Sequence, residues 1–115
     1  DLKQEVKSVN GLNLLTAKID LDAESLKNLA YELSKSVPSL YLVLAGEESG
    51  KAILVVMVAD ELVRDRKLHA GNIIRELARE IGGGGGGQPH IATAGGKNPE
   101  GIPAALRKAA VFAEG

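Results

Sequence analysis

Residues 80–96 read EIGGGGGGQPHIATAGG and place six consecutive glycines, at positions 82–87, between two regularly patterned parts of the chain. Such a run is either a flexible linker or a stretch of main chain that another group approaches closely. The residues after Gly87 supply only one short strand and one helix, too little for a hydrophobic core of their own. They must therefore pack back on the preceding part, which predicts a single domain over residues 1–115 with a glycine-rich loop at residues 82–87.

The glycine run needs a compensating gain, because holding glycine in one conformation costs roughly 0.5–1 kcal/mol more per residue than holding alanine. One gain is binding: N–H groups without neighbouring Cβ atoms can cradle a phosphate or let a ribose lie against the main chain. The other is tight packing, and the residues alone leave both open while favouring the cradle. A dinucleotide-binding or P-loop motif is excluded, because a helix leads into the run and Gln88-Pro89 leads out of it.

Charge is unevenly distributed along the chain, although the net charge is only −1. Residues 1–61 carry six Lys/Arg and ten Asp/Glu, whereas residues 62–115 carry eight Lys/Arg and five Asp/Glu. An anionic ligand would therefore be attracted to the second half, where the glycines lie. Cysteine is absent, so disulfides and thiolate zinc sites are excluded. No apolar run approaches the roughly 20 residues that cross a bilayer, and the chain begins at Asp1 rather than Met. We therefore expect a cytoplasmic fragment of a larger protein, without membrane contact.

Hydrophobic spacing predicts an α/β fold with a mixed β-sheet of about four or five strands and three main helices. Two nearly continuous apolar runs indicate strands at the sheet centre, covered on both faces. Strands are expected at residues 12–19, 40–45, 52–59 and 90–94. Helices are expected from the N-cap Asp22 to Pro38, over residues 72–81, and from Pro103 onward. Residues 5–9 are compatible with a hairpin strand or with the end of an upstream helix.

The candidate binding residues are the glycines and the polar groups near them. Lys97 directly follows Gly95-Gly96 and is a candidate phosphate contact, and His90 is a candidate hydrogen-bond donor. Arg66 and Lys67 lie in a polar connector that is also typical of a solvated surface. The predicted RNA-binding set is Gly83, Gly84, Gly85, Gly86, Gly87, Gln88, His90, Lys97, Arg66 and Lys67.

No catalytic or metal site is expected in this chain. The acidic residues are scattered, and the serines have no evident histidine partner. His69 and His90 lack the spacing of a zinc-binding pair. Tyr31, Tyr41 and Phe112 are the only aromatic residues and lie in predicted helix or core segments, so we expect recognition of RNA shape and backbone rather than base stacking.

Residues 82–96 resemble the signature of the DHHA1 family, to which the C-terminal domain of alanyl-tRNA synthetase belongs. That signature runs Gly-Gly-x-Gly-Gly-Gly-Arg-Pro-Asp-x-Ala-x-x-Gly-Gly, and residues 70–76, AGNIIRE, resemble the stretch that precedes it in the family. Three positions depart from the pattern. Gln88 replaces the usual cation, His90 replaces the usual Asp, and Gly84 fills a variable site often occupied by Lys. These departures leave backbone amides, Gln88, His90 and Lys97 for any RNA contact.

The resemblance implies the tRNA-binding tail of an alanine–tRNA ligase, which contacts the tRNA elbow and helps the aminoacylation and editing domains use one tRNA. The implied partners are alanine-specific tRNA and the remaining synthetase domains, and a homodimer stays open. No cofactor is expected in this fragment, because ATP, magnesium and the editing-site zinc belong to the other domains. Two alternatives remain: the substrate-binding DHHA1 domain of a DHH-type exonuclease or oligonucleotide phosphodiesterase, and an oligomerisation module.

Overall fold

A computed structural model describes residues 2–114, which form six strands and four α-helices. In chain order the elements are η1 (Leu2–Glu5), β1 (Lys7–Val9), β2 (Leu12–Lys18), α1 (Ala23–Ser36), β3 (Leu40–Glu48), β4 (Lys51–Val58), α2 (Asp60–Asp65), α3 (Ala70–Ala78), η2 (Arg79–Ile81), β5 (Gly83–Gly87), β6 (Ile91–Gly96), η3 (Pro99–Gly101) and α4 (Ile102–Glu114), where η marks a short 3-10 helix. The expected α/β class is confirmed, with one strand and one helix more than the sequence pattern predicts.

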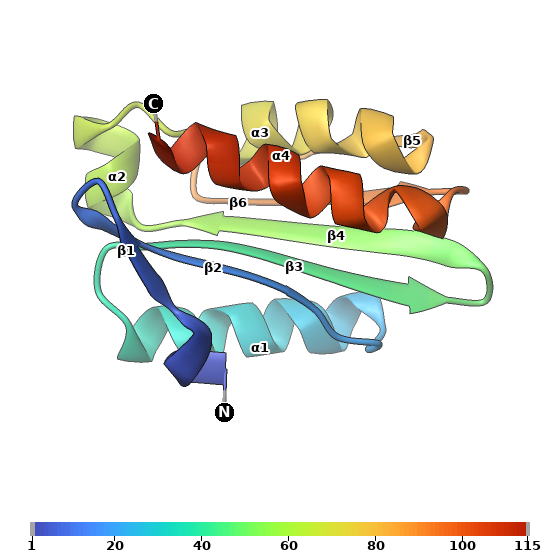
Figure 1. The fold of residues 1–115 in the computed structure, drawn as a ribbon, viewed down its shortest axis with the longest axis horizontal. Helices are drawn as coiled ribbons and strands as arrows, with labels where there is room; N and C mark the ends of the chain where they lie inside the picture. The colour runs from blue at the N-terminus through green and yellow to red at the C-terminus, as the bar shows by residue number, and fades with distance from the viewer. Residues whose placement is uncertain (1, 115) are drawn as a thin grey trace.

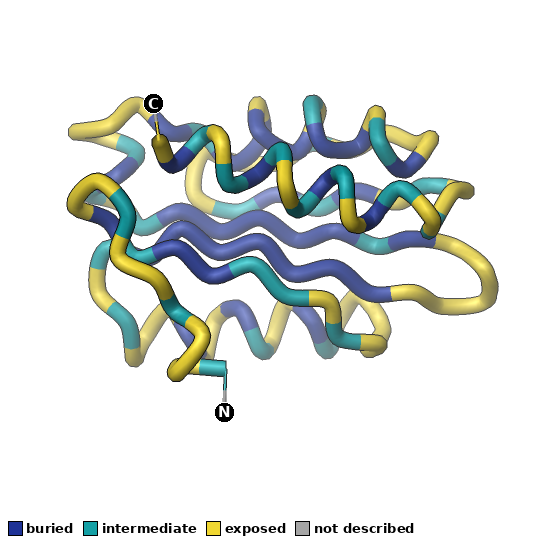
Figure 2. The backbone as a smooth tube through the Cα atoms, viewed as in Figure 1, coloured by how far each residue is buried: buried dark blue, intermediate teal, exposed yellow. Residues whose placement is uncertain are grey.

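The strands form one mixed sheet in the order β1-β2-β3-β4-β6-β5. β2 and β3 are parallel and are joined by α1, whereas every other neighbouring pair is antiparallel. Helix α1 serves as the crossover that a parallel pair requires. β3 and β4 lie at the centre and are buried along most of their length, as Figure 2 shows, which confirms the interpretation of the two apolar runs.

Helices cover the two faces of the sheet unequally (Figure 1). α3 and α4 pack on one face, and α1 alone packs on the other. The buried Tyr41 hydroxyl of β3 donates to the Ala109 carbonyl of α4 at 2.8 Å, and burial raises the pKa of this phenol. Asp22 caps α1 by accepting the Ser25 N–H at 2.7 Å, a hydrogen bond that lowers the pKa of this carboxyl. The predicted N-cap is thus confirmed.

Two segments differ from the sequence-based expectation, and a third answers a question that the sequence left open. The glycine run is not a loop: Gly82, in the left-handed conformation, ends η2, and residues 83–87 form strand β5 at the edge of the sheet. Residues 5–9 contain both alternatives: Glu5 ends the short helix η1, and Lys7–Val9 form the hairpin strand β1, which pairs with β2. The polar connector after β4 contains a helix, α2, whose Leu62 is buried in the same hydrophobic cluster as the inner faces of α3 and α4.

Within residues 2–114, no helix combines the length and the apolar character needed to cross a lipid bilayer.

Candidate nucleic-acid interface

Strand β5 is an edge strand made entirely of glycine. It pairs antiparallel with β6, with Gly83 opposite Gly96 and Gly87 opposite Ala92, and no other strand of the described residues adjoins its outer side. In an antiparallel edge strand, every second residue directs its N–H and C=O away from the partner. Because the Gln88 N–H donates to the Ile91 carbonyl, this alternation assigns the outward-directed groups of β5 to Gly83, Gly85 and Gly87, at the sheet edge next to the bare Gly84 and Gly86. Four of the five glycines are exposed and Gly86 is half-buried. Main-chain amides are therefore accessible along β5, although in a strand and not in a loop.

The five glycines of β5 divide into two classes by what surrounds them. A Cβ on Gly83, Gly85 or Gly87 would overlap main-chain atoms of β6, such as the Gly95 oxygen or the Thr93 oxygen. The fold therefore requires glycine at these three positions. A Cβ on Gly84 or Gly86 would meet no heavy atom within 4 Å. Packing does not explain the glycines at these two positions.

Gly84 and Gly86 lie on the face of the sheet that carries α1. Gly84 pairs with Gly95 and Gly86 with Thr93, and these two residues of β6 pair with Ile53 and Val55 of β4. Ile53 and Val55 belong to the hydrophobic cluster around α1. Because α1 packs on β3 and β4, β5 and β6 extend beyond its cover. We call the surface formed by Gly84, Gly86, Thr93 and Gly95 the open glycine face.

The turn between β5 and β6 is held by main-chain hydrogen bonds on two sides. At the start of α3, the Ala70 N–H donates to the Pro89 carbonyl at 2.7 Å and the Gly71 N–H to the Gln88 carbonyl at 3.2 Å. The Val58 N–H of β4 donates to the His90 carbonyl at 2.8 Å. The side chains of Gln88 and His90 are exposed and make no recorded hydrogen bond. The turn is thus fixed while its predicted ligand-binding side chains stay accessible.

His69 and the turn together occupy the N-terminus of α3. The His69 Nδ1 accepts the Asn72 N–H at 3.1 Å, and the His69 carbonyl accepts the Ile73 N–H. With Ala70 and Gly71 donating to the turn, the first amides of α3 are all engaged. This helix end therefore has no free amides to bind an anion. Among residues 2–114, no group of three or more metal-binding side chains occurs.

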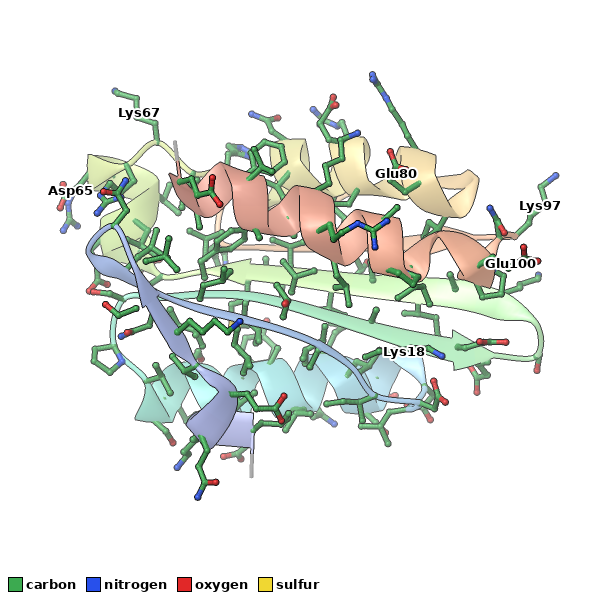
Figure 3. All side chains as sticks on the ribbon, viewed as in Figure 1. Lys18, Asp65, Lys67, Glu80, Lys97 and Glu100 are labelled. Carbon is green, nitrogen blue, oxygen red and sulfur yellow. The ribbon has the colours of Figure 1, made fainter. Side chains whose placement is uncertain are left out.

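The structure separates the predicted cations (Figure 3). Lys97 follows β6 at the Gly83 end of β5, is exposed, and points outward at one end of the long axis. Lys67 projects from the opposite end, between α2 and α3. Arg66 donates to the Asn10 carbonyl in the β1–β2 turn, at the far edge of the sheet. Of the three, only Lys97 adjoins β5.

Two exposed residues of α1 were not among the predicted binding residues. Tyr31 of α1 is 44% exposed and lines a cavity with His90 from the β5–β6 turn. Lys27 lies one helical turn before Tyr31 on the same side of α1 and is exposed. Helical spacing places both on one flank of α1, and the cavity that Tyr31 shares with His90 shows that this flank is directed to the β5–β6 turn. Tyr31 thus presents an exposed aromatic ring close to the β5–β6 turn, which its position in a predicted helix did not indicate.

Comparisons with known proteins give the same family as the sequence signature. The DHHA1 domain model matches residues 11–115. The alanine–tRNA ligase of Christiangramia forsetii is 51% identical over 111 residues, which cover 96% of this chain and 13% of that protein. The alanine–tRNA ligase of Geobacillus kaustophilus is 41% identical over 106 residues, 91% of this chain and 12% of that protein. The chain thus spans about one-eighth of the length of these relatives.

A solved structure shares the whole fold. The crystal structure of the C-Ala domain from Aquifex aeolicus alanyl-tRNA synthetase superimposes with a TM-score of 0.87 at 27% identity, covering 96% of this chain and 98% of that one. The sequence resemblance is confirmed, since relatives, family model and structure all agree. The chain belongs to the DHHA1 domain family, and within it to the group that includes the C-Ala domain of alanyl-tRNA synthetases.

Proposed function

We propose that this chain is the tRNA-binding C-terminal domain of an alanine–tRNA ligase, and that the open glycine face receives the sugar-phosphate backbone of the tRNA elbow. The domain would hold one alanine-specific tRNA for the aminoacylation and editing domains of the same synthetase, in the cytoplasm. ATP, magnesium and zinc would be bound by those other domains. The similarity to alanine–tRNA ligases supports the partner, and the geometry of β5 supports the contact surface.

The observation that carries the contact surface is the pair of glycines that packing does not require. Gly84 and Gly86 have open space where a side chain would lie, in a strand whose regular backbone accepts other residues. Valine or threonine at positions 84 and 86 would favour the strand conformation, yet both positions are glycine. A bare strip lets a ribose or phosphate approach the main chain closely, as backbone recognition of RNA requires.

The charges near the open glycine face predict weak binding. Lys97 and Lys27 are exposed and take part in no recorded ion pair, whereas Lys18 and Lys108 are paired with acidic neighbours. Few phosphates can therefore be neutralised, on the order of two or three, which gives a shallow dependence of affinity on salt. Main-chain amides and Gln88 would supply the remaining contacts.

The test is the double substitution Gly84→Val and Gly86→Val in the 115-residue chain. The two valines would stand on the open glycine face and hold RNA away from the main chain. We expect affinity for an alanine tRNA transcript to fall about tenfold, the equivalent of one or two lost hydrogen bonds to a charged group, while the thermal midpoint is unchanged or higher. Fluorescence anisotropy at about 50 mM salt measures the binding.

The matched control is Ser8→Val in β1, an exposed strand residue at the other edge of the sheet. It makes the same kind of change far from β5 and should leave tRNA affinity unaltered. The proposal is wrong if the wild-type chain binds no tRNA at this salt, or if the folded double variant binds as well as wild type.

An oligomerisation module is the second candidate, because the outer side of β5 is an unpaired strand edge among the described residues. A second copy could add its own β5 there and extend the sheet. Sedimentation of the wild-type chain over a range of concentrations distinguishes the two. A dimer without tRNA affinity would favour this function over RNA binding.

A further inference from the structure

A cavity of about 280 Å³ opens on the same face of the sheet as the open glycine face. It lies between the C-terminal half of α1, the end of β4, the start of α2 and the β5–β6 turn. Its volume is just below the range of about 300–1,000 Å³ for ligand pockets, a size for one planar ring system rather than a whole cofactor. Its chemically distinctive lining residues are Tyr31, Ser34, Met57, Asp60, Glu61 and His90.

The cavity lies next to the open glycine face along the sheet, and the two meet at the β5–β6 turn. Met57 of β4 pairs with Ile91 of β6, two residues before Thr93 on the same face of the sheet. His90 belongs to the turn that directly follows β5. An RNA strand that lies along β5 therefore reaches the mouth of the cavity at the Gly87 end.

Tyr31 gives the cavity an aromatic wall. Tyr31 is an exposed residue of α1, while Met57 and Leu40 are buried and make the floor of the cavity apolar. Exposed aromatic rings in nucleic-acid-binding proteins stack on unpaired bases. The shape and the floor of the cavity suit a base that has left its stack.

Asp60 and Glu61 determine which part of a nucleotide can enter. Two carboxylates repel phosphate, so the charged backbone must stay outside. Asp60 is exposed and takes part in no recorded hydrogen bond or ion pair, whereas Glu61 accepts the Ser39 hydroxyl at 2.9 Å through one oxygen. An ionised carboxylate accepts hydrogen bonds and donates none. It therefore selects a base edge that presents donors.

Guanine is the base whose Watson–Crick edge presents two adjacent donors, N1–H and the N2 amino group. Adenine and cytosine place one amino donor beside a ring acceptor, and uracil presents one N–H between two carbonyls. Only guanine can thus donate to both oxygens of the Asp60 carboxylate without an acceptor facing it. The exposed imidazole of His90 lies on the lining as a further polar group.

We propose that this cavity binds one unstacked guanine base, with its ring against Tyr31 and its donor edge toward Asp60. The inference that guanine binds depends on the cavity alone. The inference that this guanine belongs to an RNA strand whose backbone lies on the open glycine face rests on the proposed function. Recognition of one base would fix the register of the RNA along β5, where the glycines themselves can read no sequence.

Titration of the 15N-labelled 115-residue chain with the four nucleosides tests the proposal without using tRNA. Guanosine should shift the amide signals of Tyr31, Met57 and His90, and it should bind about tenfold more tightly than adenosine, cytidine or uridine. Asp60→Asn should remove most of this preference. Tyr31→Phe should retain binding because the ring remains, and Tyr31→Ala should weaken it at least about fivefold.

Three results would overturn the proposal: no shift at millimolar guanosine, equal binding of guanosine and adenosine, or shifts that map away from the cavity. The amide spectrum of each variant shows whether it is folded. If Asp60→Asn does not fold, Glu61→Gln serves as the second carboxylate variant. A trinucleotide with central guanosine should bind more tightly than guanosine, and should lose that advantage with Gly84→Val and Gly86→Val. If the trinucleotide and guanosine bind with equal affinity, the cavity still recognises guanine, but the guanine does not come from an RNA strand that lies on β5.

Discussion

The two faces of β5 carry the same residue for different reasons. On the face toward α3, Gly83, Gly85 and Gly87 lie so close to β6 that any side chain would overlap its main chain. On the other face, Gly84 and Gly86 have free space around them. Glycine is thus required by packing on one face and by no contact within the chain on the other.

This difference shows that the two explanations of a glycine run, close packing and ligand access, are not exclusive. A strand has a period of two, so alternate residues can serve the core and the surface independently. The first set lets β5 approach β6 under α3, and the second leaves a bare strip beside α1. The substitutions below test whether the two faces separate in experiment as they do in geometry.

The largest effect is expected from Gly85→Ala, compared with Gly84→Ala. At position 85 the added methyl would overlap the Thr93 oxygen and the Ala94 Cβ, so β5 must move off β6. We expect the free energy of unfolding to fall by about 2 kcal/mol or more, as in other overpacked sites. At position 84 the methyl is free, and alanine should be neutral or should stabilise by up to about 0.5–1 kcal/mol. Urea unfolding measures both.

The comparison between the faces would be broken if the two alanine variants unfolded at the same urea concentration. Equal destabilisation would mean that both faces are packed, and equal neutrality would mean that β5 is loosely held. In either case the argument for ligand access at Gly84 and Gly86 would lose its structural basis.

A smaller effect is expected at His69, which caps the helix end to which the β5–β6 turn is attached. His69→Ala removes the acceptor of the Asn72 N–H at the start of α3, where the β5–β6 turn is also attached. Loss of an N-cap costs about 1 kcal/mol, and His69→Asn should restore most of it because asparagine is a strong cap. His90→Ala is the control, since its side chain makes no recorded hydrogen bond. Stability that is equal in His69→Ala and His69→Asn would contradict the capping role.

Sequence reasoning gave the centre of the molecule more reliably than its edge. The apolar runs of β3 and β4 and the cap at Asp22 are local signals, and the structure confirms each of them. β5 has no such signal, because glycine has low strand propensity and carries no side chain whose burial could alternate. Its strand conformation comes from pairing with β6, a tertiary contact that local composition does not encode.

The binding surface was only partly predictable for a related reason. The glycine run and Lys97 are adjacent in sequence and remain adjacent in space. Arg66 and Tyr31 depend on the order of strands: the first is directed to the β1–β2 turn, and the second to the cavity beside the β5–β6 turn. Helical periodicity places Tyr31 on an exposed flank, but it cannot show which strand that flank faces.

The smallest effects are expected from single lysines, and they sharpen the comparison by showing which surface the RNA follows. Replacing Lys97 or Lys27 by Gln should lower tRNA affinity a few-fold and reduce the slope of log affinity against log salt by about 0.7–0.9, the value for one phosphate contact. Lys7→Gln, at the opposite edge of the sheet, is the control and should change neither quantity. Lys67 projects from the other end of the molecule and distinguishes two paths (Figure 3). If Lys67→Gln reduces the salt slope while Lys97→Gln and Lys27→Gln do not, the RNA lies on the α2–α3 connector and not on the open glycine face. The bare glycines would then need another explanation.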